Sequence, residues 1–284
     1  MPTPSRRLTL AHFQQLKTQG TSPFLCLTAA DATMAQLLEA AGVPMLLVGD
    51  SLGMTVLGYE STTLVTLADM LHHTRAVVRG SHNALVVADM PFMSYHLSEA
   101  DALANARTLL QEGGAGAVKL EGADPFVLGV IKRLAWAGVP VVGHVGLTPQ
   151  QGQRQGGFKL QAKTQASAQQ LLADALALQA AGAQLLVLEL IPQELAAEVT
   201  KALHIPTLGI GAGKHCNGQV LVTDDVLGRY QGFKPKFVRT LAHQATEAQQ
   251  AVSHLLTLVA NGDFPAEAES FSVPALTLRN SKSI

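Results

Sequence analysis

The sequence predicts a single (β/α)8 barrel, and three observations support this. Apolar strand-like runs alternate with Ala/Leu-rich helical runs over roughly 250 residues, as in an eight-fold α/β barrel. Polar side chains end five successive strands, whereas a doubly wound open sheet concentrates its site near one switch point. The first strand, 24–28, is not followed by the G-x-G-x-x-G turn of a dinucleotide-binding sheet.

The stretch MLLVGDSLGM, residues 45–54, sets the pattern for the rest of the chain. Its apolar run, 45–48, predicts a strand buried on both faces, as in a parallel sheet. The run leads into Asp50, and an aspartate is rarely buried unless it is paired or binds a metal. We therefore expect Asp50 at the C-terminal end of this strand, where the active sites of barrel enzymes lie.

The other elements follow from the same reading of the chain in order. A short amphipathic helix is predicted over 8–19 and the first strand over 24–28. Later strands carry a polar residue at or near their end: Asp50, Asp89, Lys119 with Glu121, His144 and Glu189. The seventh strand runs into the glycine-rich loop GIGAG, 209–213, and the eighth is placed at 219–222. Helices are predicted over 33–41, 66–79, 98–112, 124–137, 166–181 and 193–203.

Composition indicates one domain and excludes several classes of partner. The chain has 284 residues, 48% of them hydrophobic, and no shift in composition, so we predict one domain over 1–271 and a poorly ordered extension over 272–284. A net charge of -1 without a basic run gives no footprint for nucleic acid or an anionic membrane. No signal peptide or spanning segment is recognisable. Two unpatterned cysteines, Cys26 and Cys216, suit a reducing cytoplasm, which is the expected location.

Strand periodicity predicts which polar side chains meet. Residues two apart on a strand share a face, so Lys119 and Glu121 are expected to point into the mouth of the barrel together. The same argument pairs Val48 with Asp50, Val87 with Asp89, Val142 with His144 and Val187 with Glu189. Closing the barrel would then collect four carboxylates, one lysine and one imidazole around one pocket.

Several carboxylates at close range repel one another, and a divalent cation removes that repulsion. The oxygen ligands Asp50, Asp89 and Glu121, with no thiolate, favour Mg²⁺ or Mn²⁺ over zinc. The alternative is that each acid is an ordinary strand-end cap or ion pair.

Glu189, Lys119 and His144 each allow a functional and a structural interpretation. Glu189 lies among apolar neighbours and suits a general base, or else forms a structural salt bridge to Lys119 or to the helix after strand six. Lys119 neutralises a substrate carboxylate or pairs with Glu121. His144 donates a proton or is simply a hydrogen-bonded imidazole, the second being favoured.

Two loops complete the prediction. The G-x-G-x-G spacing of 209–213 opens no clear helix, so its glycines are taken to let the backbone approach a ligand or a neighbouring strand closely. The long polar loop 148–166 could form a lid.

Seven motifs occur in order: VGDSLGMTVLG, ADMPFMSY, VKLEG, GHVGLTPQ, GAQLLVLE, GIGAG and PKFV. Over about residues 8–271 the chain resembles the ketopantoate hydroxymethyltransferase (3-methyl-2-oxobutanoate hydroxymethyltransferase) family. GDSLGM and GHVGLTPQ, correctly spaced, are the most specific part of this resemblance.

The resemblance implies a (β/α)8 barrel of the phosphoenolpyruvate mutase-like group with one Mg²⁺ per subunit, commonly assembled as a decamer. The reaction implied is the first step of pantothenate biosynthesis, in which 3-methyl-2-oxobutanoate and 5,10-methylenetetrahydrofolate give 2-dehydropantoate (ketopantoate). Carried over by motif, Asp50 and Asp89 would hold the metal, with Glu121 joining directly or through water. Ser51 and Lys119 would contact the oxoacid. Glu189 would accept the proton.

The chain departs from the family pattern at three places. Ala30 stands where an aromatic residue is frequent, and Ala162 replaces the glycine that ends GGYKVQG. Glu269 replaces the histidine of EEHSF. These changes bear on lid and subunit contacts, because the residues predicted for the metal and the base are intact.

Two other functions remain open from the residues. One is a Mg²⁺-dependent lyase or mutase on the same barrel that cleaves a carbon bond of an oxoacid. Such enzymes commonly supply a reactive cysteine from a mobile loop, and Cys216 is in a different context. The other is a non-catalytic barrel that only binds a metabolite.

Overall fold

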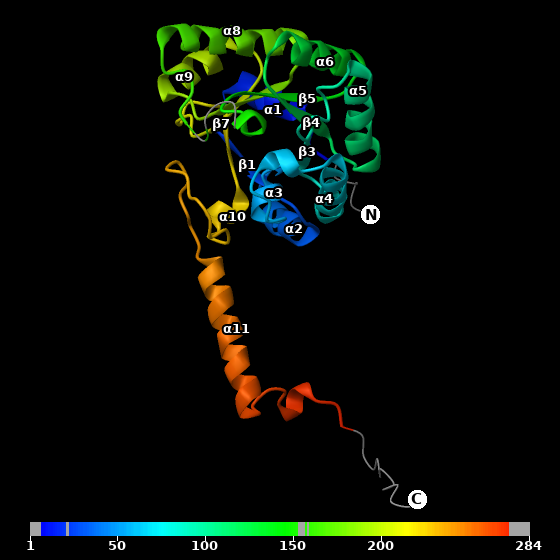
Figure 1. Cartoon of the computed structure of the whole chain (residues 1–284), viewed down its shortest axis with the longest axis vertical. Helices are drawn as coiled ribbons and strands as arrows, with labels where there is room; N and C mark the ends of the chain where they lie inside the picture. The colour runs from blue at the N-terminus through cyan, green and yellow to red at the C-terminus, as the bar shows by residue number, and fades with distance from the viewer. Residues whose placement is uncertain (1–6, 21–22, 153–156, 158, 273–284) are drawn as a thin grey trace, which may run out of the picture.

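A closed barrel of eight parallel strands forms the body of the protein (Figure 1). The computed structural model describes residues 7–20, 23–152, 157 and 159–272. The strands follow one another in sequence order, and pairing of the first with the eighth closes the barrel. They are β1 Phe24–Thr28, β2 Met45–Val48, β3 Leu85–Asp89, β4 Ala117–Glu121, β5 Val141–Gly146, β6 Leu185–Glu189, β7 Thr207–Ile210 and β8 Gly218–Leu221. The predicted fold class is confirmed.

Helices surround the barrel, and the predicted ones begin and end within one or two residues of the observed bounds. The helices are α1 Leu10–Gln19, α2 Ala32–Ala40, α3 Leu52–Thr55, α4 Leu67–Gly80, α5 Glu99–Arg107, α6 Pro125–Trp136, α8 Gln165–Ala181, α9 Gln193–Ala202, α10 Thr223–Val226 and α11 Gln244–Asn261. Short 3-10 turns lie at η1 Thr62–Leu64, η3 Pro149–Gln151 and η4 Glu267–Glu269. The predicted helix 98–112 ends in a π-helical turn, η2 Thr108–Glu112. The sequence prediction did not include α3, α10 or α11.

Side-chain caps fix where several of the helices start. Asp31 accepts a hydrogen bond from the backbone N–H of Met34 at 2.7 Å and so begins α2. A reciprocal capping box between Thr66 and Asp69 begins α4. Each cap satisfies backbone N–H groups that have no partner inside the helix. The chain therefore enters α2 and α4 at a defined residue.

The apolar core has two layers. One lies between the barrel and the surrounding helices, and the other fills the barrel itself. Leu10 and Phe13 of α1 belong to the inner layer, where the Phe13 ring lies 4.7 Å from that of Phe24 at the start of β1. Helix α1 therefore closes the N-terminal end of the barrel. Within the described residues, the open end that can receive a ligand is the C-terminal one.

The predicted pleat is correct for most strands and wrong at β2. Val118 and Leu120 pack in the outer layer, so Lys119 and Glu121 do face the barrel mouth. Val48, however, also packs in the outer layer, and Leu47 faces the pocket instead. Val48 and Asp50 therefore do not share a strand face. Strand β2 ends at Val48, and the turn that follows carries Asp50 into the pocket.

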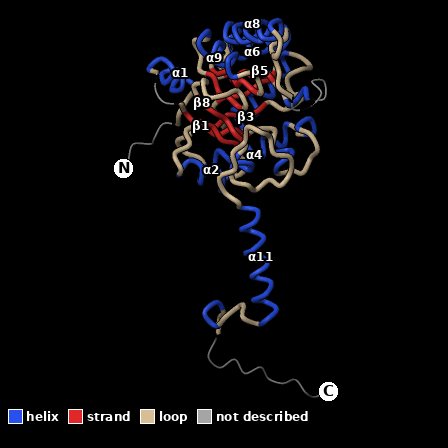
Figure 2. The backbone as a smooth tube through the Cα atoms, turned by 90° about the vertical axis from the view of Figure 1, so that its left-hand side faces the viewer, coloured by secondary structure: helices blue, strands red, loops and turns tan. Residues whose placement is uncertain are grey.

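Helix α11 extends away from the barrel, and none of its residues is buried (Figures 1 and 2). Among the described residues, none of the helices is both long and apolar enough to cross a membrane. Cys26 and Cys216 are both buried and free. Residues 273–284, nearly all of the predicted C-terminal extension, lie outside the described residues, as do 153–156 and 158 of the predicted lid loop.

Candidate active site

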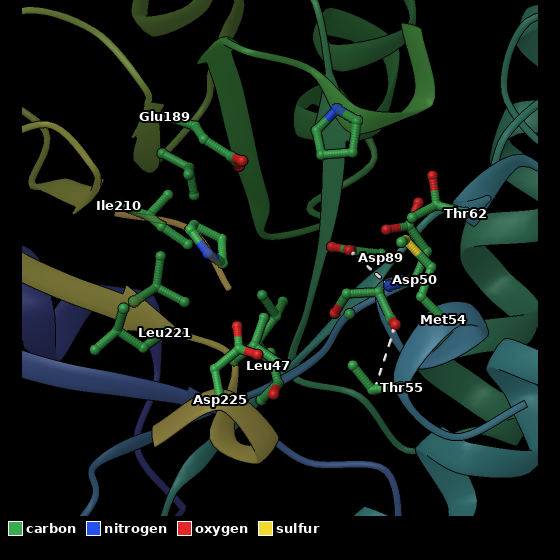
Figure 3. A pocket seen from close by; sticks show the side chains of 18 of the residues that line it. Leu47, Asp50, Met54, Thr55, Thr62, Asp89, Glu189, Ile210, Leu221 and Asp225 are labelled. Carbon is green, nitrogen blue, oxygen red and sulfur yellow. Dashed lines mark hydrogen bonds between the residues drawn. The ribbon is translucent and has the colours of Figure 1, made fainter. Parts of the chain in front are cut away.

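A pocket of about 290 Å³ opens at the C-terminal end of the barrel. All the polar residues predicted for the site line it: Asp50, Ser51, Asp89, Lys119, Glu121, His144 and Glu189. Figure 3 shows Asp50 and Asp89 on one side of the pocket and Glu189 on the opposite side, close to Ile210. The structure therefore brings the predicted residues together, and their individual roles remain predictions.

Asp50 and Asp89 form a buried, directly connected pair of acids in the site. The backbone N–H of Asp50 donates to Asp89 Oδ2 at 3.0 Å, which couples the turn after β2 to the end of β3. Burial, reinforced by the charges of Asp89 and Glu121, raises the pKa of Asp50 well above its ordinary value. Burial also raises the pKa of Asp89, although Lys119 opposes this. Burial and the neighbouring acids thus oppose the charged form of both carboxylates.

Lys119 is the only lysine that lines the pocket within the described residues. Its Nζ lies 3.0 Å from Asp89 Oδ1 and 3.6 Å from Glu121 Oε1, so both acids share one ammonium. Burial alone would lower the pKa of Lys119, but the carboxylates of Asp89, Glu121 and Asp50 raise it above its ordinary value. Lys119 therefore carries its charge at neutral pH.

His144 lies between two acids. Its Nδ1 is 3.5 Å from Glu121 Oε1, and its Nε2 is 3.3 Å from Glu189 Oε2. Burial and the charge of Lys119 lower the pKa of the imidazole, but its contacts with Glu121 and Glu189 outweigh them and raise it to about 9. Glu189 thus has an imidazole partner, rather than the lysine or helix contact considered from the sequence.

Glu189 ends β6, and the chain turns sharply directly after it. Leu190 has a φ of 47°, a left-handed backbone that is uncommon for a residue other than glycine. The carbonyl of Leu190 accepts a hydrogen bond from the backbone N–H of Gln161 at 2.8 Å. The C-terminal part of the predicted lid loop is thereby tied to the strand end that carries Glu189.

Gln150 and Tyr95 organise the acids, and the sequence reasoning gave neither a role. Gln150 Nε2 donates to Asp50 Oδ2 at 2.9 Å, and the Gln150 backbone N–H donates to Glu121 Oε2 at 3.1 Å. The Tyr95 hydroxyl donates to Gln150 Oε1 at 2.7 Å and accepts from the backbone N–H of Glu121 at 3.2 Å. Their signal was present, because they end the motifs ADMPFMSY and GHVGLTPQ.

The donor set fits a hard divalent cation. Two buried oxygens, Asp89 Oδ1 and Glu121 Oε1, accept no well-formed hydrogen bond from the described residues, although Lys119 lies nearby. Within the same residues, no three His, Cys, Asp or Glu side chains form a ready-made metal site. Mg²⁺ suits this arrangement, because it binds through one or two carboxylates and keeps water or substrate oxygens as its other ligands.

Comparisons with known proteins agree with the motifs. The model of the family described as ketopantoate hydroxymethyltransferase matches residues 7–267. The chain is 51% identical over 276 residues to the 3-methyl-2-oxobutanoate hydroxymethyltransferase of Dehalococcoides mccartyi (strain ATCC BAA-2266 / KCTC 15142 / 195), and the match covers 97% of each chain. It is 53% identical over 266 residues to the protein of the same description from Syntrophus aciditrophicus (strain SB), covering 94% of this chain and 97% of the relative.

Solved structures with the same fold are more distant in sequence. Phosphoenolpyruvate phosphomutase from Streptomyces platensis subsp. rosaceus superposes with a TM-score of 0.59 at 15% identity, covering 92% of this chain and 93% of that one. Phosphonopyruvate hydrolase in complex with oxalate and Mg²⁺ gives 0.59 at 14% identity, covering 94% and 93%. Likeness at this identity shows the fold alone, an eight-stranded barrel surrounded by helices.

Proposed function

Because the chain belongs to the ketopantoate hydroxymethyltransferase family, we propose that it takes a one-carbon unit from 5,10-methylenetetrahydrofolate and adds it to 3-methyl-2-oxobutanoate. The product is 2-dehydropantoate (ketopantoate), formed at the first step of pantothenate biosynthesis. The observation that carries the proposal is the placement of Glu189 across one pocket from the carboxylates of Asp50 and Asp89. A base and a cation site on opposite sides of a small pocket suit enolisation of an oxoacid.

Asp50 and Asp89 would hold the cation, with Glu121 joining directly or through water. When bound, Mg²⁺ would act as a Lewis acid on the carboxylate and keto oxygens of the substrate and so favour loss of the C3 proton. The raised pKa of Asp50, caused by burial and by the neighbouring acids, supports this assignment, because it marks negative charge that the protein itself does not neutralise. The Mg²⁺ named with phosphonopyruvate hydrolase is consistent with it.

Lys119 and Ser51 would receive the carboxylate of the oxoacid. Both line the pocket, and Lys119 remains charged at neutral pH because three carboxylates surround it. The Ser51 side chain is half-buried and makes no cap hydrogen bond to α3, so its hydroxyl is available to a ligand. Charge-assisted hydrogen bonds to a substrate carboxylate would fix the orientation of the small oxoacid.

Glu189 would remove the proton from C3 of the oxoacid. C3 then forms a bond to the methylene carbon of the folate, and both carbon–nitrogen bonds of that methylene break, with their electrons going to nitrogen. One water is consumed overall and supplies the hydroxyl oxygen of the product, and tetrahydrofolate leaves. The contact of Glu189 with His144 supports this role, because an adjacent imidazolium can orient the carboxylate and return a proton.

Assembly and location are also proposed from the family. We expect a homodecamer with one Mg²⁺ per subunit, in the cytoplasm. Ultracentrifugation of the purified chain tests the assembly, because a decamer and a monomer differ tenfold in mass.

The test of the function is direct. The purified protein is mixed with 3-methyl-2-oxobutanoate, 5,10-methylenetetrahydrofolate and Mg²⁺, and ketopantoate is measured by mass spectrometry. We expect ketopantoate only when all three are present. A lyase would instead consume oxoacids without folate and release cleavage products, and a binding protein would leave all the compounds unchanged. Either result would contradict the proposal.

A further inference from the structure

The walls of the pocket differ in chemistry, and the oxoacid reaction uses only one of them. The acids and Lys119 form the polar wall, whereas the segment after α10 supplies Tyr230, Phe233, Pro235 and Phe237. We call these four residues the aromatic wall. Two of them, Pro235 and Phe237, belong to the motif PKFV, for which the proposed reaction has no role. A branched oxoacid is small, and it already finds apolar side chains at the end of the barrel.

Close packing against glycines holds two of the rings in place. Gly211, with a φ of 60°, has the Phe237 ring so near that an added Cβ would lie 2.8 Å from its Cδ1. A Cβ on Gly232 would lie 2.3 Å from the Tyr230 ring. The contact with Phe237 explains why position 211 of the loop GIGAG is a glycine, because the loop backbone lies directly against the Phe237 ring.

The rings are also left accessible. Phe233 is 70% exposed although it lines the pocket, and Tyr230 and Phe237 are half-buried. Aromatic side chains grouped at the mouth of a pocket offer faces on which a flat ring can stack. The volume of about 290 Å³ leaves room for more than the oxoacid.

The same segment is positively charged. Lys234, Lys236 and Arg239 are exposed, and residues 226–246 contain no acidic residue. Among the described residues, Lys234, Lys236 and Arg239 form no ion pair. The charge of Lys234 lowers the pKa of Asp225, against the effect of burial. A ligand that suits the whole segment therefore combines a flat heterocycle with carboxylates.

We propose that the aromatic wall binds the pterin ring of the folate co-substrate and that Lys234 and Lys236 receive its glutamate carboxylates. This inference rests on the proposed function and assigns the second substrate to a specific part of the pocket. Stacking on the rings would hold the carrier at the pocket that also contains Glu189, so that the methylene carbon meets C3 of the oxoacid. Stacking accepts a flat ring without exact hydrogen-bond matching, and the lysines add salt-dependent attraction.

Phe233→Ala and Phe237→Leu test the stacking part. For each variant, the KM for 5,10-methylenetetrahydrofolate is measured, together with C3 proton exchange of the oxoacid in D2O without folate. We expect the KM for the carrier to rise about tenfold, which is the usual effect of losing one stacking ring. The rate of C3 proton exchange should fall by a much smaller factor. Equal losses in both measurements, or no change in the KM, would overturn the proposal. Phe126→Ala, at a partly exposed phenylalanine of α6 outside the pocket, is the matched control.

Lys236→Ala tests the contact with the tail. We expect the KM for the triglutamate form of the carrier to rise several-fold more than the KM for its pteroate form, which lacks glutamate. Equal changes for the two carriers would show that Lys236 does not receive the tail. Lys132→Ala, an exposed lysine on α6, is the control.

Binding of tetrahydrofolate alone separates this inference from the proposed function. Calorimetry on the wild type and on Phe233→Ala measures the Kd without any reaction. Weaker binding by the variant would support the aromatic wall even if no ketopantoate formed, in which case only the proposed function would fail. Equal Kd values, or no binding by the wild type, would overturn the inference even if ketopantoate were made.

Discussion

His144 Nε2 lies 3.3 Å from Glu189 Oε2 at the end of the barrel, while its Nδ1 lies 3.5 Å from Glu121. One imidazole therefore connects the proposed base to an acid proposed for the cation site. Because the pKa of His144 is raised to about 9, chiefly by its contacts with these two acids against the effect of burial, the ring is charged at neutral pH. Its position suits a role in orienting the Glu189 carboxylate. Stabilisation of the negative charge that develops on the substrate oxygen is then the role of the cation.

We expect removal of the metal to lower the rate of C3 proton exchange more than removal of this imidazole does. Chelation with EDTA should reduce C3 proton exchange of 3-methyl-2-oxobutanoate to the rate without enzyme, since electrostatic stabilisation is usually the largest catalytic term. His144→Gln should lower the exchange rate by only about tenfold, less than the ~10² expected for loss of a general base. NMR in D2O measures both. A His144→Gln variant as inactive as the chelated enzyme would show that the imidazole itself moves the proton.

Gln150→Leu should weaken Mg²⁺ binding. The amide of Gln150 holds Asp50 Oδ2 at 2.9 Å, and the substitution leaves that carboxylate free to rotate away from the site. Loss of such an orienting partner typically costs about 10- to 100-fold in metal affinity. Calorimetric titration with Mg²⁺ gives the Kd. Gln151→Leu, at the neighbouring half-buried position in η3, should bind as the wild type does, and equal affinities for the two variants would contradict the role of Gln150.

Ala162→Gly should stabilise the protein. Ala162 has a φ of 52°, and the family pattern that this chain resembles has glycine there. The left-handed backbone costs a residue with a Cβ about 1–2 kcal/mol, while glycine adds about 0.5–1 kcal/mol of chain entropy to be lost on folding. The free energy of unfolding in urea should therefore rise by up to about 1.5 kcal/mol. Ala168→Gly, inside α8, should lower it by about 1 kcal/mol, and the same sign for both variants would contradict the argument.

Glu39 should make stability depend on acid pH. Its carboxylate accepts hydrogen bonds from the Ser81 hydroxyl at 2.6 Å and from the backbone N–H groups of 82–84. Burial acts in the opposite direction, but these bonds lower the pKa of Glu39 to about 2. The unfolded value is about 4.3, so the stabilisation is complete above that pH and is lost as the pH falls toward 2.

Glu39→Gln should therefore lower the free energy of unfolding at pH 7 by about 1–3 kcal/mol. It should also flatten the decline of stability between about pH 5 and pH 2. Urea titrations at several pH values measure both effects. Glu99→Gln, which removes an exposed pair with Arg133, should change little, and an unchanged acid profile for Glu39→Gln would contradict the argument.

The fold could be predicted from the sequence because strands and helices alternate with clear stops, and because polar residues end the strands. That argument also found the polar residues at the strand ends, all of which line the pocket: Asp50, Asp89, Lys119, Glu121, His144 and Glu189. Ser51 was implied only by the family resemblance. The argument failed at Val48, since strand periodicity says nothing about the turn at Gly49 that carries Asp50 inward. It missed Gln150, whose bond to Asp50 joins residues 100 positions apart. Such a contact has no periodic signature.

The contribution of the segment after β8 to the pocket could not be predicted from the alternation of strands and helices either. Tyr230 and Phe237 lie in irregular backbone, where only the three-dimensional course of the chain brings them to the pocket. Helix α11 did have a signal, because 244–261 is rich in helix-forming Ala, Gln and Leu and is followed by Gly262 at its C-terminal cap.

The central claim is that Glu189 removes the C3 proton of the oxoacid in a metal-dependent step. The most direct measurement is C3 proton exchange of 3-methyl-2-oxobutanoate in D2O, by NMR, with Mg²⁺ and without folate. We predict exchange by the wild type and by Glu194→Gln, an exposed glutamate near the start of α9, and a loss of at least ~10² in Glu189→Gln. Exchange that survives in Glu189→Gln, or that does not need Mg²⁺, would contradict the claim.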